Sequence, residues 1–170
     1  MDIDEAIRTR RTHKAYRPEP VPRETLDQFF DLARWAPNHH LTVPWRFRVL
    51  GPRSLERIKA VAGPEGGGKL DRAPTLIAVT CVESDDPIQG EEDLLATGVA
   101  AYIVLLAAHA RGLGSYWRTP GFLRERPGLE ALGVPAGEHF VALLHLGVAA
   151  GVQGPPPDRP AAAATVTYLE

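Results

Sequence analysis

The chain has 170 residues, of which 44% are hydrophobic and 24% charged, and its 19 basic and 21 acidic side chains give a formal net charge of −2. This composition predicts one folded domain over residues 1–170 and argues against a disordered chain. The balanced charge and a pI near 6.3 argue against nucleic acid or an anionic membrane as the main partner.

The single cysteine, Cys81, excludes an intramolecular disulfide and any cysteine-rich zinc or iron–sulfur site. The N-terminal residues 1–5 are acidic where a signal peptide would be basic and then apolar. The longest apolar stretch, residues 99–108, is well short of the roughly 20 residues that span a bilayer. We therefore expect no membrane partner and a cytoplasmic location.

Helices and strands alternate along the chain, which predicts an α/β or α+β class. Helices are expected where apolar residues recur at helical spacing or acids and glycines bound an apolar run, at residues 4–10, 23–36, 53–62 and 91–111, with one or two short helices within 120–132. Strands are expected at residues 46–50, 75–82, 115–119 and 140–148. The 75–82 run is almost continuously apolar, so it should be buried on both faces, and 91–111 should be a central buried or interface helix.

Residues 63–68 read as a flexible, glycine-rich loop. The spacing of glycines before Lys69 resembles a phosphate loop. However, Leu70 stands where Ser or Thr should hold magnesium, and Pro74 prevents a long helix from following. We expect a loop here, not a nucleotide triphosphate site.

Residues 151–170 read as an extended arm that ends in a strand. Residues 151–160 contain four prolines, and residues 165–169 then show a strand pattern. A strand after such an arm often pairs away from its own neighbours, so a second subunit is its expected position.

The sequence gives little support for a hydrolase or for a metal site. None of the three serines lies in a G-x-S-x-G elbow, and Cys81 lies within an apolar strand where thiolate formation is disfavoured. His139 and His145 share a strand face, but further ligands are missing, so no metal site is expected.

The basic run from residue 8 to residue 17 has two interpretations. Arg8, Arg10, Arg11, Lys14 and Arg17 put five cations into ten residues with no acid between them. Such a run is commonly a solvated basic face. Adjacent guanidinium groups beside hydroxyl groups are also what a phosphate monoester needs for bidentate binding.

Two further segments carry polar and aromatic groups. Residues 36–47 combine a helix end, a polar loop and an aromatic strand start, which alone would be an ordinary loop with a core tryptophan. Residues 112–120 contain two glycines that expose backbone, and Arg118 with Thr119 offers another anion contact.

In this order and at these distances, the three segments resemble the nitroreductase family of FMN-dependent oxidoreductases, specifically its small branch. The first segment, I-x-x-R-R-T-H-K-A-Y-R, resembles the opening motif of that family. The resemblance implies that Arg10, Arg11 and Thr12 hold the FMN phosphate or ribityl chain. It also implies that Lys14 lies near the flavin N1–O2 edge, where a cation tunes the cofactor.

The other two segments extend the resemblance. Residues 36–47 resemble the family segment that the other subunit contributes, in which His39 matches a flavin-contacting position and Val43 replaces a glutamine. Residues 112–120 resemble the G-x-W-R-S motif of the small branch, which implies that Trp117, Arg118 and Thr119 lie at the flavin and that Arg118 contacts the phosphate.

The resemblance implies an α+β fold, in which a mixed, mostly antiparallel sheet is flanked by helices. It also implies a homodimer with two FMN sites at the interface, whose sheets are completed by exchanged C-terminal strands. The implied activity is ping-pong reduction of nitroaromatic, quinone or similar acceptors by NAD(P)H, with hydride passing through flavin N5 and no catalytic acid or base from the protein. A flavin-storage protein and a variant with dehydrogenase, dehalogenase or flavin-breakdown activity remain as alternatives.

Overall fold

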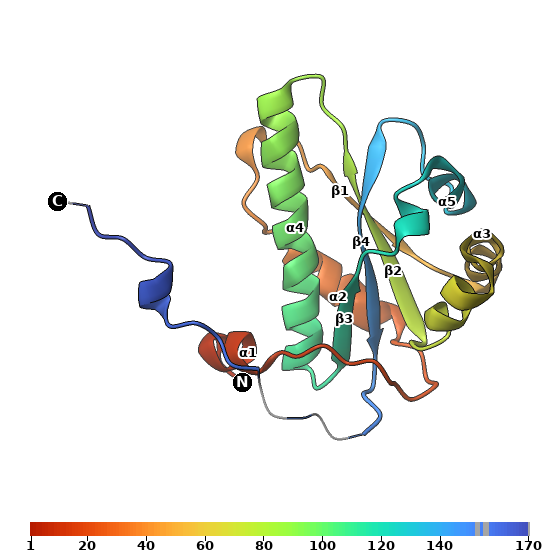
Figure 1. The fold of residues 1–170 in the computed structure, drawn as a ribbon, viewed down its shortest axis with the longest axis horizontal. Helices are drawn as coiled ribbons and strands as arrows, with labels where there is room; N and C mark the ends of the chain where they lie inside the picture. Colours follow the sequence, from red (N-terminus) through yellow and green to blue (C-terminus); the bar gives the residue numbers. More distant parts are fainter. Residues whose placement is uncertain (152–153, 155–156, 170) are drawn as a thin grey trace.

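A four-stranded antiparallel sheet lies at the centre of the fold (Figure 1). The computed structural model describes residues 1–151, 154 and 157–169. The strands stand in the order β1-β2-β4-β3, with bounds β1 Trp45–Val49, β2 Thr75–Val82, β3 Gly114–Arg118 and β4 Glu138–Gly147. This arrangement confirms the α+β class, and all strand pairs of the described residues are antiparallel.

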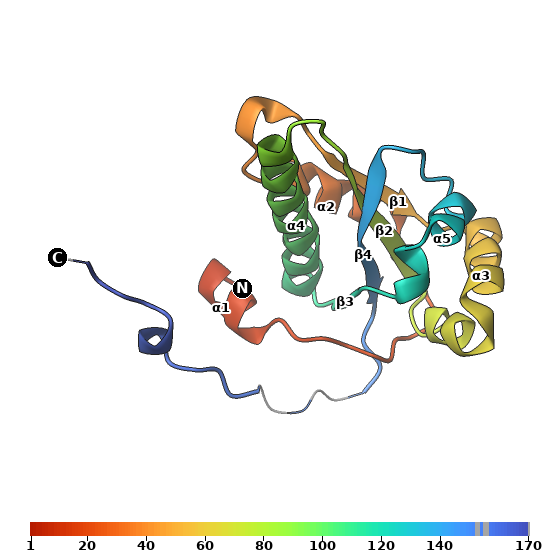
Figure 2. The same ribbon diagram turned by 45° about the horizontal axis from the view of Figure 1, so that its top comes forward.

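Helices cover both faces of the sheet (Figures 1 and 2). α2 and α4 pack on one face, and α3 and α5 pack on the other. The helix bounds are α1 Ile3–Thr9, α2 Arg23–Ala33, α3 Pro52–Leu70, α4 Pro87–Ala110 and α5 Arg126–Ala131, with short 3-10 turns at His39–Leu41, Gly121–Leu123 and Ala162–Ala164.

β2 is buried on both faces, as its continuous apolar pattern predicts. Ile77 and Val79 belong to the core under α2 and α4, while Leu76 and Ala78 belong to the core under α3 and α5. The alternating directions of side chains along a strand divide one apolar run between two cores.

α4 is the central core helix, and it begins four residues before the start expected from its acids. Asp86 caps it by accepting hydrogen bonds from the backbone N–H groups of Ile88 and Gln89, at 2.9 and 3.4 Å, and Pro87 occupies the first turn. By length and composition alone α4 is apolar enough to cross a membrane, but half of its most apolar 18-residue window is buried inside the fold. The buried core helix of a folded protein also meets these criteria of length and composition.

The expectation of a flexible loop at residues 63–68 is wrong, because α3 continues to Leu70. Gly63 adopts a positive φ of 67°, and the helix resumes with Pro64 in the first turn after the kink. Proline is tolerated there because the N–H it lacks would have no helical acceptor. The buried side chain of Leu70 fixes the second half of α3 in the core.

The end of α2 also differs from its expected position, because the helix ends at Ala33 instead of residue 36, with Arg34 as its C-cap. Residues 165–169, where we expect a strand that pairs with a second subunit, are exposed in the single chain and follow the turn at Ala162–Ala164. This C-terminal segment runs away from the body of the fold (Figure 1).

Substitutions at two helical glycines should change the free energy of unfolding in opposite directions. A Cβ atom on Gly128 in α5 would lie 1.9 Å from the carbonyl oxygen of Phe122, whereas a Cβ atom on exposed Gly68 in α3 would meet nothing within 4 Å. We expect Gly128→Ala to lower the free energy of unfolding by about 1–3 kcal/mol or more, as overpacking does. We expect Gly68→Ala to raise it by about 0.5–1 kcal/mol, because alanine favours a helix. Urea unfolding measures both, and a destabilising Gly68→Ala would contradict the helical assignment of residues 64–70.

Candidate functional site

The basic N-terminal segment crosses the ends of β3 and β4. Thr12 forms an isolated parallel bridge with Ser115, and the backbone N–H of His13 donates to the carbonyl oxygen of Ser115 at 3.0 Å. Further along, Tyr16 bridges to Ala149. The fold therefore joins the first and third sequence segments, which are about a hundred residues apart.

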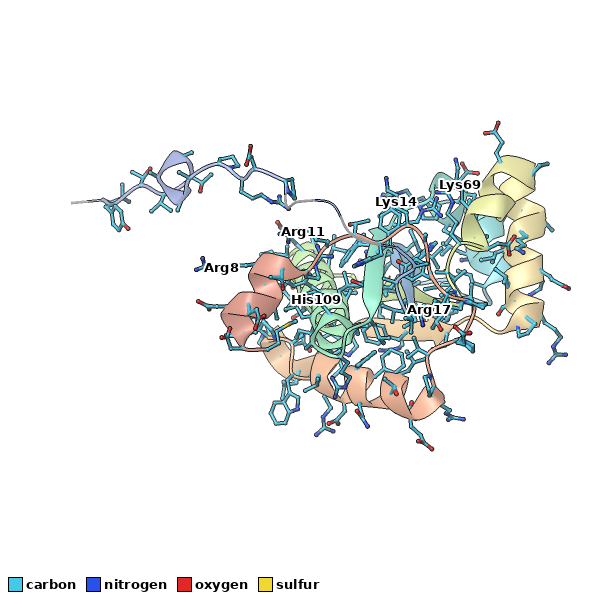
Figure 3. The ribbon with its side chains drawn as sticks, turned by 90° about the horizontal axis from the view of Figure 1, so that it is seen from below. Arg8, Arg11, Lys14, Arg17, Lys69 and His109 are labelled. Atoms are coloured by element: carbon cyan, nitrogen blue, oxygen red, sulfur yellow. The ribbon has the colours of Figure 1, made fainter. Side chains whose placement is uncertain are left out.

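A cavity of about 510 Å³ lies at the end of α1. We call it the arginine cavity, and the described residues that line it are Ile7, Arg8, Arg10, Arg11, Tyr102, Pro157 and Arg159. This lining contains four arginines and no acid. Figure 3 shows Arg8 and Arg11 at this end of the molecule.

Arg10 lines the arginine cavity, and one of its donor groups has no hydrogen-bond partner among the described residues. Its guanidinium carbon lies 5.8 Å from the centre of the Tyr102 ring, a cation–π arrangement. Its buried Nε atom has no hydrogen-bond partner among the described residues. An unsatisfied buried donor costs about 1–3 kcal/mol, and an anionic oxygen in the cavity would offset that cost.

Arg11 stiffens the same segment. Its Nη1 donates to the carbonyl oxygens of Arg8 and Arg10 at 2.6 and 2.9 Å, which ties the side chain to the backbone at the end of α1. The two adjacent arginines therefore differ. Nη1 of Arg11 donates to backbone carbonyl oxygens, whereas Nε of Arg10 has no partner among the described residues.

Two histidines lie behind the arginine cavity. The oxygen Oγ1 of Thr9 and the Nε2 atom of His109 are 2.8 Å apart, which links α1 to the last turn of α4. The ring of His13 packs against Gly114, and its buried Nδ1 has no partner among the described residues. Burial lowers the pKa of both imidazoles, and the charge of Arg10 also lowers both, while a hydrogen bond with the Arg11 backbone partly offsets the change for His13. The net shift favours the neutral form of each ring.

A second basic cluster lies toward α3. Nη1 of Arg118 donates to the carbonyl oxygen of Lys69 at 3.3 Å, and its guanidinium carbon lies 5.9 Å from the Tyr116 ring centre. Lys14 and Lys69 make no side-chain hydrogen bond or ion pair in the described part of the chain, and Figure 3 draws both toward α3. His145 of β4 lies opposite Tyr116 and is buried, and its pKa is lowered to about 3 by that burial and by Arg118 and Arg72.

Arg118 is absent from the described lining of the arginine cavity. Trp117 is half-buried against the core under α4, and Thr119 is exposed next to Arg118. The structure thus groups Arg10 and Arg11 at one place and Arg118 with Lys69 at another.

The polar loop at residues 38–43 is built on the other end of α4. The buried carboxylate of Asp93 accepts hydrogen bonds from Thr42 at 2.5 Å and from Gln89 at 3.0 Å. Asn38 accepts from the backbone N–H of Val43 at 2.7 Å. Three residues other than glycine have positive φ angles here: His40 (58°), Leu41 (51°) and Val43 (49°).

His39 is exposed on this loop, and its Nδ1 atom lies 2.7 Å from Oε2 of Glu92. Glu92 and His109, which contacts Thr9, are seventeen residues apart in α4, about 25 Å at the rise of an α-helix. One chain therefore does not bring the His39 and Val43 loop to the arginine cavity.

Sequence reasoning missed four residues that the structure places around these sites. Arg159 and Tyr102 line the arginine cavity, Lys69 lies beside Arg118, and Asn38 organises the loop. Arg159 is a lone arginine in a proline-rich arm, and Tyr102 is one aromatic in an apolar helix, so neither stands out by pattern. Asn38 directly follows Pro37 at the first position of the loop, and that position is the one signal that the sequence offers for it.

The model of the nitroreductase family matches residues 7–66 and 61–148, so the chain belongs to the nitroreductase family. A protein of Methanothermobacter thermautotrophicus, provisionally named an NADH dehydrogenase or NAD(P)H nitroreductase, is 39% identical over 120 residues. That alignment covers 69% of this chain and 60% of the relative, so the chain spans less than two thirds of that protein.

Solved structures share the fold. A nitroreductase-like family protein from Bacillus cereus superposes with a TM-score of 0.87 at 24% identity, covering 99% of this chain and 96% of that one. A protein of Desulfovibrio desulfuricans, provisionally named a nitroreductase and crystallised in complex with FMN, gives a TM-score of 0.82 at 28% identity, covering 99% and 98% of the two chains.

Proposed function

We propose that this protein is an FMN-dependent NAD(P)H oxidoreductase that reduces nitroaromatic compounds, quinones or similar acceptors. The arginine cavity carries the proposal, because it offers a charge-matched and partly unsatisfied site for a phosphate monoester. Membership of the nitroreductase family and the FMN complex of the Desulfovibrio relative support it. The name of the Methanothermobacter relative supports NAD(P)H as the electron donor.

The residues present fit the phosphate end of FMN. Arg10 has a buried donor without a partner among the described residues, and the described lining of the cavity adds three more guanidinium groups and no acid. Arg10, Arg11 and Arg159 would hold the phosphate, and Thr12 would contact the phosphate or the ribityl chain. Tyr102 would close the cavity from the side of α4.

The second basic cluster fits the ring end. Lys14 would lie near the N1–O2 edge, where its unpaired ammonium group favours electron acceptance by the ring. Trp117, Arg118 and Thr119 would border the flavin, with Lys69 beside Arg118. FMN, when bound, supplies hydride transfer at N5 between the nicotinamide donor and the acceptor, which would use the same site in turn.

A homodimer is part of the proposal because one chain separates its candidate segments. His39 and Val43 would reach the flavin bound by a second copy, and the strand at residues 165–169 would complete the sheet of that copy. α4 also exposes a stripe of apolar side chains along one side, at Ile88, Leu95, Val99 and Tyr102. Their spacing of seven, four and three residues is that of one helix face. A cytoplasmic location agrees with the lone, buried Cys81.

The first prediction separates an enzyme from a flavin carrier. Purified protein given FMN should become yellow, and either NADH or NADPH should bleach the flavin bands under anaerobic conditions. A quinone or nitroaromatic should then restore them. Dithionite reduces flavin without a nucleotide, so bleaching by dithionite is the control that shows that the bound flavin can be reduced. Bleaching by neither nucleotide would indicate a storage protein, and protein that ignores added FMN would overturn the proposal.

The second prediction concerns the phosphate. Arg10→Ala should weaken FMN binding by about 1–3 kcal/mol, the range for a charge-assisted hydrogen bond, and should leave riboflavin affinity nearly unchanged because riboflavin lacks the phosphate. Arg118→Ala should weaken both ligands if Arg118 borders the ring, and FMN alone if it contacts the phosphate. Fluorescence titration measures each affinity.

Arg23→Ala is the matched control, since Arg23 is exposed on α2 and pairs with Asp27. Wild-type affinity for FMN in both the Arg10 and the Arg118 variants would refute the phosphate assignment.

The third prediction concerns the dimer. Leu95→Glu puts a charge in the middle of the exposed apolar stripe of α4, so it should convert a dimer into a monomer and release FMN while circular dichroism stays unchanged. Val61→Glu, on the exposed side of α3, is the matched control and should leave the dimer intact. Sedimentation at micromolar concentration reads the mass, and a monomeric wild-type chain that binds FMN would contradict the shared site.

A further inference from the structure

The contact between α1 and α4 fixes where the proton lies on His109. The hydroxyl of Thr9 donates to the carbonyl oxygen of Glu5 at 2.6 Å. A hydroxyl has one proton to donate, so Oγ1 must accept the hydrogen bond that joins it to Nε2 of His109 at 2.8 Å. His109 therefore carries its proton on Nε2, and any additional proton binds at Nδ1.

His109 lies in the electric field of the arginine cavity. The charged and titratable groups that face it are Arg10, Arg11 and His13 from the N-terminal segment and Glu5 from α1. Burial contributes most to its lowered pKa, followed by Arg10, His13 and Arg11, while Glu5 opposes the shift. The arginines that attract an anion are thus the same charges that keep a proton off His109. Figure 3 shows His109 and Arg11 at the same end of the molecule.

We propose that His109 is a positioning residue of the arginine cavity: it anchors the arginine-bearing end of α1 through Thr9, and it takes up a proton when a phosphate monoester enters. This inference rests on the proposed function. A dianion beside Arg10 and Arg11 offsets their repulsion of a charged imidazole, so the protonated form of His109 becomes less unfavourable. Because binding and protonation are linked, each then favours the other by the same factor.

The sign of the pH effect follows from the direction of the pKa change. Without an anion the pKa of His109 lies below its ordinary value, and with the anion it moves up. Between those two values binding takes up a proton, so affinity for the phosphate end increases as pH falls. The second ionisation of a phosphate monoester, with a pKa of about 6, works in the opposite direction because acid removes the dianion. Only a comparison with a variant that cannot titrate at residue 109 isolates the contribution of His109.

Two variants separate anchoring from protonation. His109→Gln keeps an N–H donor at the position of Nε2 but stays neutral, whereas Thr9→Val removes the hydroxyl and keeps the imidazole. FMN and riboflavin affinities are measured by flavin fluorescence at about pH 8 and about pH 6, on either side of the ordinary histidine pKa. His139→Gln is the matched control, since His139 lies on β4 near Glu83.

At the higher pH, wild type and His109→Gln should bind FMN equally. At the lower pH, His109→Gln should bind about three- to tenfold more weakly than wild type, because a pKa change of one unit corresponds to a factor of ten. Thr9→Val should weaken FMN binding by about two- to tenfold at both pH values, the range for one lost hydrogen bond. Riboflavin should show no pH-dependent difference between wild type and His109→Gln.

A measurement on the wild-type chain keeps the test independent of variant folding. The imidazole titration of His109, followed by NMR, should move to higher pH when FMN is bound, and riboflavin should not move it. An unmoved titration, or parallel pH curves for wild type and His109→Gln, would overturn this inference and leave the proposed function standing. A chain that binds no FMN at any pH would overturn both.

Discussion

The apolar character of α4 on nearly all of its sides constrains the rest of the structure. Ala100, Ala101 and Val104 are fully buried against the sheet and α2, yet Leu95 and Val99 remain exposed on the same helix. A sheet covers only one side of a helix, so a helix that is apolar all round needs a second covering surface. The chain also ends in an apolar segment that its own sheet does not pair, since Tyr168 and Leu169 are almost fully exposed.

The length of α4 then separates the chemistry of the chain into two ends. One end holds α1, the arginine cavity and His109, and the other end carries the loop with His39. Among the described residues, the arginine cavity and the His39 loop are therefore far apart within one chain. In the homodimer proposed above, a symmetric arrangement of two copies would bring opposite ends together.

Charge is distributed unevenly over the chain. The whole chain is slightly acidic, but the described lining of the arginine cavity has four guanidinium groups and no carboxylate. The buried Nε of Arg10 is left without a partner among the described residues, while Nη1 of Arg11 donates to two backbone carbonyls. Folding therefore leaves one buried donor unsatisfied at a cost in stability, which a bound anion would offset in the proposed function.

The sequence predicts the elements whose physical signal is local. Residues 75–82 are almost continuously apolar and rich in β-branched residues, and the buried strand β2 has those same bounds. The start of α4 was missed because the cap at Asp86 and Pro87 precedes the acids that looked like the helix start. Residues 63–68 were mistaken for a loop because glycine lowers helix propensity, which burial of Leu70 overrides in the folded chain.

The candidate site was harder to predict because its parts meet only in three dimensions. The arginines and hydroxyls of residues 8–17 were visible in the sequence, and the resemblance gave them roles. Arg159 and Tyr102 reach the same cavity from an irregular arm and an apolar helix, and no spacing rule connects them. The separation of His39 from Arg10 likewise follows from the direction of α4, not from the distance between the residues in the sequence.

The loop before β1 shows how contacts within the fold hold a strained segment. A β-branched residue such as Val43 is costly at a positive φ of 49°, so the loop would relax unless its surroundings held it. Asn38 binds the backbone of Val43, and the buried carboxylate of Asp93 binds Thr42. Glu92 then contacts Nδ1 of the exposed His39, and Nε2 of that ring has no hydrogen bond within the described part of the chain. The strain is thus stabilised by contacts from α4, and in the homodimer proposed above this prepared loop would complete the site of the second copy.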